Sequence, residues 1–479
     1  MSEDNQNKKG FRLWHAFVAA ALLLVITFSA FTAKRAYDFK NTQEASPLTA
    51  EQIYNLNELL YSQYPSEHQL LKKLPYNIGQ PQLDVWAKSA ILLDVSNGNI
   101  LYEKNADAII PPASMTKLFA MYVVEEEIAS GRFSYDQVIP LPPESWACNM
   151  PPHSSLMFLG KGQRVTMEEL LLGLSICSGN DAAYALAYTV SGSMEAFVER
   201  MNLVASDLGL VHTHFVESSG YSELNQTTAR EMAEFATIYL RRHLQSLHRF
   251  HSVLDFTYPK AKNLAPGDRL LAQDFTQGLP EKITMPITQQ NTNPLLGKLE
   301  GCDGLKTGYI DESGYNLSLT AVRGQTRFLS VTMGGPGSNA REGQAGRVHD
   351  GTELMEWAFK NFADTSLELK VHPYLVRSFN ASEKMLRLVP AFTEHSFTVP
   401  YVTGTTMSEN LDSVKIQVQL PDYIWGKVEQ GSPLGKITIS AADYVLQEIP
   451  LVADRPLTRA NYLSTLSDLI LSKIFVMNK

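Results

Sequence analysis

The chain has 479 residues, 44% of them hydrophobic and 19% charged, and a formal net charge of -9. This length favours two or three domains, and the composition is that of a folded chain rather than a disordered one. The balance of 41 basic against 50 acidic residues argues against a nucleic-acid-binding protein, because phosphate contacts require a basic surface. The 3 cysteines are too few for a disulfide scaffold, and none lies in the spacing of a zinc site. A multidomain globular enzyme is the class that remains.

The N-terminal segment sets the expected compartment. Residues 13–33 contain no Asp, Glu, Lys or Arg, and as a helix they would extend about 31 Å, roughly the hydrocarbon thickness of a bilayer. Lys8, Lys9 and Arg12 precede this run and favour a cytoplasmic N-terminus, so the rest of the chain is expected to be exported. The length of the run and the lack of a clean cleavage motif favour an uncleaved anchor over a signal peptide, but both interpretations of residues 1–33 stay open.

Two local patterns follow this segment. Residues 34–84 are polar and mixed, and we expect a spacer that contains one helix over residues 50–61 with Thr49 as its N-cap. Residues 90–102 predict a β-hairpin. Its turn is placed at Asn97-Gly98, because Asn-Gly readily adopts the positive φ values of a type I′ turn.

The central part of the chain mixes helical and strand patterns. A helix is predicted over residues 114–127, and a helical region over residues 167–188 is interrupted at residues 178–180. Residues 315–322 and 326–333 are strand-like. Helices bracketed by strands predict an α+β or α/β catalytic domain.

The expected catalytic domain covers residues 85–365, and a small β-rich domain follows over residues 366–453. Apolar and polar residues alternate over residues 414–420, which predicts a half-buried strand. Residues 457–479 carry apolar side chains at helical spacing and form an expected amphipathic helix. It is too polar to span a bilayer, and either a membrane interface or a docking site on the β-rich domain would suit it.

The residues Ser114-Met115-Thr116-Lys117 have the form S-x-x-K at the start of a predicted helix. Positions i and i+3 share a helical face, so the amine of Lys117 can reach the hydroxyl of Ser114. A serine is a poor nucleophile unless a base accepts its proton, and a lysine is such a base only when burial or a neighbouring cation lowers its pKa. The backbone N–H of Ser114 also lies at a helix N-terminus, where negative charge is stabilised.

Two further triplets complete the pattern. Ser178-Gly179-Asn180 supplies a hydroxyl for a proton relay and an amide for hydrogen bonding to a substrate. Lys306-Thr307-Gly308 begins a strand-like run on whose edge a peptide could dock, and its lysine is a second cation that would lower the pKa of Lys117. Each motif alone is usually a capped helix, a turn or a surface lysine. All three in this order in an exported chain are a specific signal.

The motifs and their flanks resemble the serine D-alanyl-D-alanine carboxypeptidases, the low-molecular-mass penicillin-binding proteins. The matching blocks are residues 112–117, 178–183 and 303–308, together with Ser219-Gly220-Tyr221 and Gly334-Gly335. The match covers about residues 85–450. It implies an α+β fold in which a β-lactamase/transpeptidase-like domain, an antiparallel sheet with helices, precedes a small all-β domain. The helix over residues 457–479 is similar to the family's membrane anchor.

The resemblance also implies roles for individual residues. In hydrolysis of the terminal D-Ala-D-Ala bond of muropeptides, Ser114 would be the nucleophile, Lys117 the general base and Ser178 the proton relay. The implied substrate-binding residues are Asn180, Lys306, Thr307, Gly308, Tyr309 and Arg347, and the N–H groups of Ser114 and Tyr309 would form the oxyanion hole.

No metal or organic cofactor is implied by the resemblance. The expected partners are peptidoglycan stem peptides, β-lactam antibiotics and the membrane surface at one or both termini, with the enzyme on the extracytoplasmic face of a bacterial cytoplasmic membrane.

The sequence departs from the family pattern in two places. Tyr309-Ile310 stand where His-Thr is common, and the segment before Ser114 is longer than usual. Cys177 and Cys302 border the second and third motifs and are interpreted as small buried residues. Three alternative functions stay open: a DD-endopeptidase, an inert membrane-tethered wall-binding protein, and a serine β-lactamase, for which Glu217 would be the candidate deacylation base.

Overall fold

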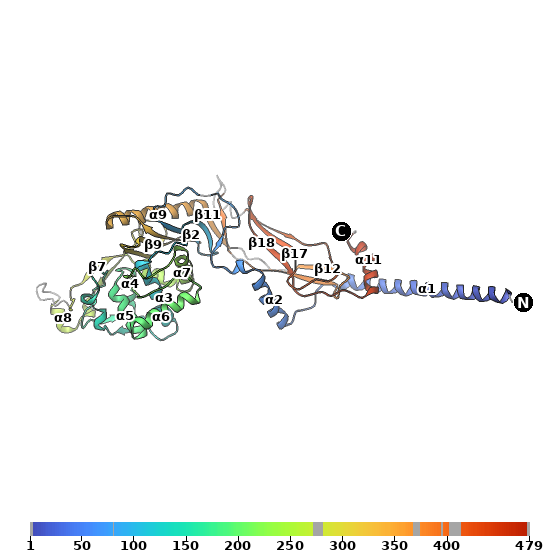
Figure 1. Cartoon of the computed structure of the whole chain (residues 1–479), viewed down its shortest axis with the longest axis horizontal. Coiled ribbons are helices and arrows are strands. Elements are labelled where there is room, and N and C mark those ends of the chain that lie inside the picture. Colours follow the sequence, from blue (N-terminus) through green and yellow to red (C-terminus); the bar gives the residue numbers. More distant parts are fainter. Residues whose placement is uncertain are drawn as a thin grey trace. The chain divides into compact units, whose positions relative to one another are not determined.

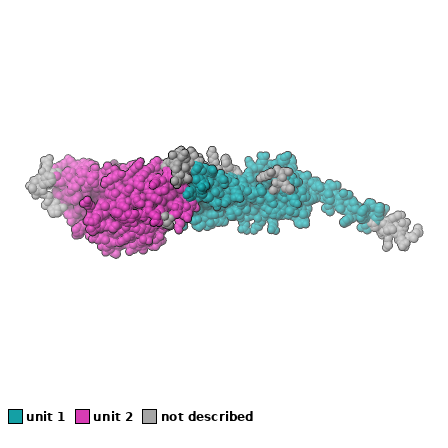
Figure 2. Space-filling model, turned by 90° about the horizontal axis from the view of Figure 1, so that it is seen from above, with its two compact units in different colours: residues 1–69, 367–395, 412–479 teal, residues 70–366, 396–411 magenta. Residues whose placement is uncertain are grey.

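The computed structural model describes residues 3–79, 81–271, 281–366, 374–393, 396–401 and 413–476. The chain forms two compact units, which are coloured separately in Figure 2. Unit 1 comprises Met1–Gln69, Leu367–His395 and Asp412–Lys479, and unit 2 comprises Leu70–Ser366 and Ser396–Leu411. Unit 2 contains the three motifs.

A six-stranded sheet forms the centre of unit 2 (Figure 1). Its strand order is β1-β3-β2-β10-β9-β8, and neighbours are antiparallel except for the parallel pair β1 and β3. The strands are β1 (Lys72–Lys73), β2 (Ser89–Asp94), β3 (Asn99–Lys104), β8 (Cys302–Ile310), β9 (Gly314–Arg323) and β10 (Thr326–Gly335). The predicted strands over residues 315–322 and 326–333 are therefore confirmed as β9 and β10.

Helices cover both faces of this sheet. The helices of unit 2 are α3 (Thr116–Ala129), α4 (Met167–Ser175), α5 (Asn180–Ser191), α6 (Met194–Asp207), α7 (Ala229–Arg242), α8 (Pro266–Leu271) and α9 (Ala340–Asn361). Successive side chains of a strand point to opposite faces, and β2 shows the result. Ile91 and Leu93 join the core that contains α3 to α7, whereas Ala90 and Leu92 join the core that contains α9. The sheet is thus buried between two helical layers.

The break predicted at residues 178–180 separates α4 from α5. Thr166 begins α4 with a capping box, in which its hydroxyl and the Glu169 carboxylate each accept a backbone N–H. Ser178 has a φ of 56°, a left-handed conformation that ends helical geometry, and α5 begins two residues later at Asn180. The interruption therefore turns the chain and presents Ser178 at the start of a new helix.

Three small two-stranded sheets complete unit 2. They pair β4 (Val138–Ile139) with β5 (Val165–Thr166), β6 (Asp255–Tyr258) with β7 (Ile287–Gln290), and β11 (Phe362–Ser366) with β14 (Ser396–Pro400).

The predicted hairpin is present as β2 and β3, but its turn is not of type I′. Gly98 has a φ of 77°, whereas Asn97 is not among the residues with positive φ in the described chain, and a type I′ turn requires positive φ at both. The Asn97 side chain instead accepts the backbone N–H of Asn99, and the Asp94 carboxylate accepts that of Ser96. These local bonds stabilise a longer connection, so the prediction of the turn type was wrong.

A second six-stranded sheet forms unit 1. Its order is β15-β17-β18-β13-β12-β16, antiparallel except for the parallel pair β12 and β16. The strands are β12 (Tyr374–Phe379), β13 (Met385–Pro390), β15 (Val414–Gln419), β16 (Ile424–Trp425), β17 (Pro433–Ala441) and β18 (Tyr444–Ala453). The strand predicted over residues 414–420 is present as β15, but the prediction that it is half-buried was wrong, because its apolar residues Ile416 and Val418 are exposed on this edge strand.

The helix predicted within the spacer is α2 (Ala50–Gln63), and it packs onto this sheet. Thr49 caps α2 as expected, in a capping box with Gln52. Leu56 and Leu60 are buried in one cluster with Val452 of β18. The segment before the catalytic unit therefore carries part of the core of unit 1.

The two terminal helices, α1 (Glu3–Asn41) and α11 (Tyr462–Val476), also meet in unit 1. Phe39 of α1 is 1% exposed and packs with Phe379 of β12 and Leu471 of α11. Arg35 donates from Nε and Nη2 to the carboxylate of Asp468, which is fully buried and also accepts the backbone N–H of Asn380. One face of the C-terminal helix thus docks onto α1 and the β sheet.

Candidate active site

Ser114 lies in a single 3-10 turn, Ala113–Met115, directly before α3. Two glycines allow other segments to approach this turn closely. A Cβ on Gly308 would lie 2.5 Å from the carbonyl oxygen of Pro112, and one on Gly220 would lie 1.8 Å from that of Ala113. Both distances are far below contact distance, so only glycine permits this packing. The turn is thereby held between β8 and the loop after Ser219.

Lys117 reaches Ser114 across the first turn of the helix, as the S-x-x-K spacing predicts. Its Nζ lies 2.8 Å from Ser114 Oγ, 2.8 Å from Asn180 Oδ1 and 2.5 Å from the carbonyl oxygen of Ser219. The last two atoms only accept hydrogen bonds. A neutral amine has two N–H bonds and one lone pair, so donation to these two acceptors leaves the lone pair facing Ser114 Oγ.

Burial favours the neutral form of the Lys117 amine. Lys117 is fully buried, and the loss of hydration lowers its pKa to about 7, although the carboxylates of Glu217 and Asp181 oppose this change. Burial, rather than the second cation that we expected, is the main cause. The unprotonated form of Lys117 is therefore accessible near neutral pH.

The second and third motifs meet at another buried amine. Lys306 of β8 is 1% exposed, and its Nζ donates to Ser178 Oγ at 2.9 Å and to the Thr307 carbonyl at 3.1 Å. Burial, then the nearby cations Lys117 and Arg347, hold the pKa of Lys306 well below its ordinary value. The two amines therefore belong to one electrostatic cluster.

The third motif lies on a strand of its own. We expected Lys306-Thr307-Gly308 to begin a strand-like run with an open edge, and the motif lies within such a strand, β8, which already begins at Cys302. Among the described residues, β8 is the edge strand of its sheet and pairs with β9. The turn Asp311–Ser313 reverses the chain between the two strands. Thr307 Oγ1 donates to Thr292 Oγ1 at 2.7 Å.

Arg347 of α9 contacts the same strand from behind. It is 7% exposed, and it donates from Nε to the Asn316 carbonyl at 3.0 Å and from Nη2 to the Gly308 carbonyl. Nη1 donates to Gln344 at 3.3 Å, and the guanidinium lies 5.0 Å from the ring centre of Tyr315. Its burial lowers its pKa to about 10, so the side chain remains cationic at neutral pH.

A cleft of about 540 Å³ opens over Ser114. Of the residues predicted from the motifs, Ser114, Asn180 and Tyr309 line it, and the amines and Arg347 lie behind this surface. Sequence reasoning gave no role in the site to the other lining residues, which are Pro152, His153, Ser155, Gly220, Tyr221, Glu223, Ile310, Asp311 and Glu312. The Ser219-Gly220-Tyr221 match was the one signal that pointed to part of this lining.

Glu217 holds the loop that supplies the Ser219 carbonyl. One carboxylate oxygen accepts the N–H of Ser219 at 2.7 Å and its hydroxyl at 2.5 Å. The other accepts the Gly220 N–H at 2.6 Å and Asn225 Nδ2 at 2.9 Å. With both oxygens engaged and the side chain absent from the cleft lining, Glu217 is a structural residue of this loop.

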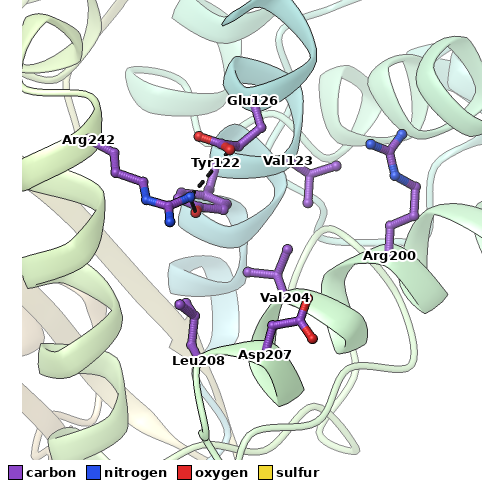
Figure 3. A pocket seen from close by; sticks show the side chains of 8 residues that line it. All are labelled: Tyr122, Val123, Glu126, Arg200, Val204, Asp207, Leu208 and Arg242. Carbon is purple, nitrogen blue, oxygen red and sulfur yellow. Dashed lines mark hydrogen bonds and ion pairs between the residues drawn. The ribbon is translucent and has the colours of Figure 1, made fainter. Parts of the chain in front are cut away.

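The cysteines and a second pocket lie outside this chemistry. Cys177 is buried, Cys302 is partly buried, and burial raises their pKa values to about 12 and about 11, so both stay protonated. Figure 3 shows a pocket of about 310 Å³ between α3, α6 and α7, which includes Tyr122, Glu126 and Arg242. No motif residue lines it.

Residues 76–337, more than half of the chain, match the sequence pattern of the D-alanyl-D-alanine carboxypeptidase family. The chain belongs to this family. The matched segment contains every residue of the predicted site except Arg347. This carboxypeptidase is accordingly a serine peptidase that acts through an acyl-enzyme.

Relatives and solved structures agree with this assignment. The chain is similar to the D-alanyl-D-alanine carboxypeptidase DacF of Bacillus subtilis, at 29% identity over 79% of this chain and 88% of the relative. DacA of Escherichia coli is 34% identical over 61% of this chain and 65% of the relative. Penicillin-binding protein 5 of Haemophilus influenzae superposes with a TM-score of 0.61 at 27% identity, over 80% of this chain and all (100%) of that one. Penicillin-binding protein 6B of Escherichia coli gives 0.60 at 28% identity with the same coverage. The expected fold class is confirmed.

We predict that Gly308→Ala slows acylation of this carboxypeptidase at least about tenfold. The new methyl group would overlap the Pro112 carbonyl oxygen and push β8 away from the Ser114 turn. Gly267→Ala, which meets open space, is the matched control and should acylate normally. Acylation rates with fluorescent penicillin, beside thermal unfolding curves, make the measurement. Normal acylation by Gly308→Ala would show that the close approach is unimportant.

We predict a pH dependence from the Lys117 amine. The neutral form is the active one, and its fraction rises as the pH increases through the lowered pKa, so the acylation rate should climb between about pH 6 and pH 8 and then level off. The measurement is the rate of penicillin acylation against pH at constant ionic strength. A rate that falls over this interval would contradict a neutral Lys117 as the base.

Proposed function

We propose that this carboxypeptidase removes the terminal D-alanine from peptidoglycan pentapeptides with Ser114 as nucleophile and Lys117 as general base. The observation that carries the proposal is the environment of the amine. The carbonyl oxygens of Asn180 and Ser219 take its two N–H bonds, and the remaining lone pair can accept only the proton of Ser114 Oγ.

The leaving group requires a proton, and Ser178 is placed to relay it. Its hydroxyl oxygen accepts from Lys306 Nζ, so its own proton is free to point towards a departing amine. When Ser114 Oγ bonds to the carbonyl carbon, its proton passes to Lys117 and the C–N bond breaks. D-Alanine leaves with a proton from Ser178, which the proton held by Lys117 replaces, and water then hydrolyses the ester. Arg347, which stays cationic at neutral pH, supplies positive potential for the substrate carboxylate, and Lys306, whose pKa is held well below its ordinary value, would act as a hydrogen-bond donor.

The edge of β8 would hold the substrate backbone. The oxyanion would lie between the N–H groups of Ser114 and Tyr309, where loss of one donor typically raises the barrier by about 3 kcal/mol. Thr307 would bind the terminal carboxylate by turning its hydroxyl proton away from Thr292, and Asn180 would bind the substrate amide. Arg347 would act mainly by fixing the Gly308 carbonyl and by its charge, because its donors already bind the chain.

β-Lactam antibiotics would acylate the same serine. Their strained cyclic amide presents a carbonyl to Ser114 as the peptide does, but the leaving nitrogen stays tethered. Glu217 is occupied by four donors from its own loop and is not available to activate a hydrolytic water, which favours a slow release of the bound drug over the β-lactamase alternative.

We also propose that the enzyme is held at the membrane by a retained N-terminal helix. An apolar stretch within Phe11–Asn41 has a mean hydropathy of 2.3 and no buried residue. The same continuous helix continues to the buried Phe39 and the Arg35–Asp468 ion pair. The apolar side of α11, including Leu463, Ile470 and Ile474, is exposed beside it and suits a lipid interface.

Replacement of the nucleophile tests the catalytic assignment. Ser114→Ala should abolish both covalent labelling by fluorescent penicillin and the loss of one D-alanine from a pentapeptide, a decrease of at least about 10³-fold, measured by mass spectrometry. A wild-type enzyme that labels no better than this variant would refute the assignment. Cleavage of a cross-linked dimer in preference to the pentapeptide would instead identify an endopeptidase.

Retention of the helix is tested by the mass of the purified membrane-bound protein. We expect the intact N-terminus, and we expect Arg35→Ala to stay in the membrane fraction but to expose α11 to proteolysis more readily, because Asp468 is left as an unpaired buried carboxylate. Lys34→Ala, on the neighbouring exposed position, is the control. A mature protein that begins after residue 30 would show that the segment is a cleaved signal.

A further inference from the structure

A buried chain of polar side chains runs from α3 to β8 and has no part in the mechanism above. Glu125 of α3 accepts a hydrogen bond from Tyr239 Oη of α7 at 2.7 Å. Tyr239 Oη lies 2.9 Å from His251 Nε2, and His251 Nδ1 lies 3.2 Å from both Ser175 Oγ and the Leu305 carbonyl oxygen. Glu125 is 2% exposed, and Tyr239 and His251 are fully buried.

The two ends of this chain lie on the two elements that carry the active site. Glu125 is eight residues after Lys117 on α3, and Leu305 immediately precedes Lys306 on β8. His251 also packs its Cβ against Gly304, where an added methyl group would lie 3.3 Å away. A change in these hydrogen bonds would therefore directly affect the position of β8, the strand that carries the third motif.

We propose that Glu125, Tyr239 and His251 are positioning residues for the carboxypeptidase reaction, which hold β8 by a hydrogen bond from His251 to the Leu305 carbonyl. This inference rests on the proposed role of Lys306 and Thr307 in substrate binding. None of the three residues touches the cleft.

The numbers of donors and acceptors allow these side chains two arrangements of their hydrogen bonds. With Glu125 protonated, its O–H donates to Tyr239 Oη, Tyr239 donates to His251 Nε2, and the imidazole proton sits on Nδ1 and donates to the Leu305 carbonyl. With Glu125 ionised, Tyr239 donates to the carboxylate, the imidazole proton moves to Nε2 to donate to Tyr239, and Nδ1 accepts from Ser175. One proton leaves to solvent, and Leu305 loses its donor.

Both states are accessible near neutral pH. Burial raises the pKa of Glu125 to about 7 against the opposing hydrogen bonds from Ser246 and Tyr239, while burial lowers that of His251 to about 4 and keeps the imidazole neutral. The other charged or titratable groups that act on the chain are Arg249, Glu126, Tyr135 and Lys306. Rising pH thus favours the state in which the Leu305 carbonyl of β8 has no hydrogen bond from His251.

The isosteric variant Glu125→Gln separates this device from general packing. Its amide N–H replaces the carboxyl proton and fixes the first state at every pH. The control is Glu126→Gln, the next residue on the same helix, whose side chain faces the outer pocket and bonds to His243 and Arg242 (Figure 3).

For wild type we expect the KM for a pentapeptide to rise about fivefold between pH 5.5 and pH 8.5, the value of one ordinary hydrogen bond. The Glu126→Gln control should show the same rise with its midpoint at a somewhat lower pH, because the Glu126 carboxylate raises the pKa of Glu125. For Glu125→Gln, KM should stay low and flat, and for Tyr239→Phe it should be flat, because Glu125 then has no hydrogen-bonded connection to His251. The rise of kcat due to Lys117 should persist in all four. A KM for Glu125→Gln that follows the wild-type pH profile would overturn the proposal.

Nitrogen NMR of ¹⁵N-histidine-labelled full-length enzyme gives an independent measurement. The His251 signal, assigned by its loss in His251→Gln, should change from the Nδ1–H to the Nε2–H tautomer with rising pH and stay as Nδ1–H in Glu125→Gln. One tautomer throughout in wild type would also refute the inference, even if Tyr239→Phe does not fold. Failure of the wild-type enzyme to be acylated at Ser114 would instead refute the proposed function.

Discussion

The active site depends on the hydrogen-bonding capacity of one buried amine. Lys117 faces three oxygen atoms, two of which can only accept, and a neutral amine satisfies this set in one way, with its lone pair towards Ser114. Desolvation favours the neutral form of the amine, so the same burial that would ordinarily be a cost produces the base that we propose. Asn180 and the Ser219 loop are therefore as important to the nucleophile as the helix that carries it.

Two neighbouring segments, a loop and an edge strand, maintain that arrangement. Gly220 and Gly308 let a loop and an edge strand approach the Ser114 turn without a side chain between them. Glu217 fixes the loop and Arg347 fixes the strand, each through backbone groups. Neither charged side chain needs to contact the substrate to influence the site, since each one determines where a backbone group lies.

Local features were predictable from the sequence, and long-range ones were not. The Thr49 cap, the S-x-x-K contact and the helix break at Ser178 follow from rules that span a few residues. The type I′ prediction for the Asn97-Gly98 turn was wrong because side-chain hydrogen bonds of Asp94 and Asn97 stabilise a different conformation. The contacts Thr292–Thr307 and Lys117–Ser219, and the packing of α2 on a distant sheet, join segments whose proximity only the fold determines.

The engagement of Glu217 also constrains how such an enzyme can change. A carboxylate able to drive water onto a penicilloyl ester would have to come from the neighbourhood of the serine, and Glu217 is there. Releasing it would remove the support of the Ser219 carbonyl, and with it the orientation of Lys117. Antibiotic-destroying activity along this route would therefore disable acylation before it improved turnover, so a descendant of this scaffold would have to take its deacylation base from another segment.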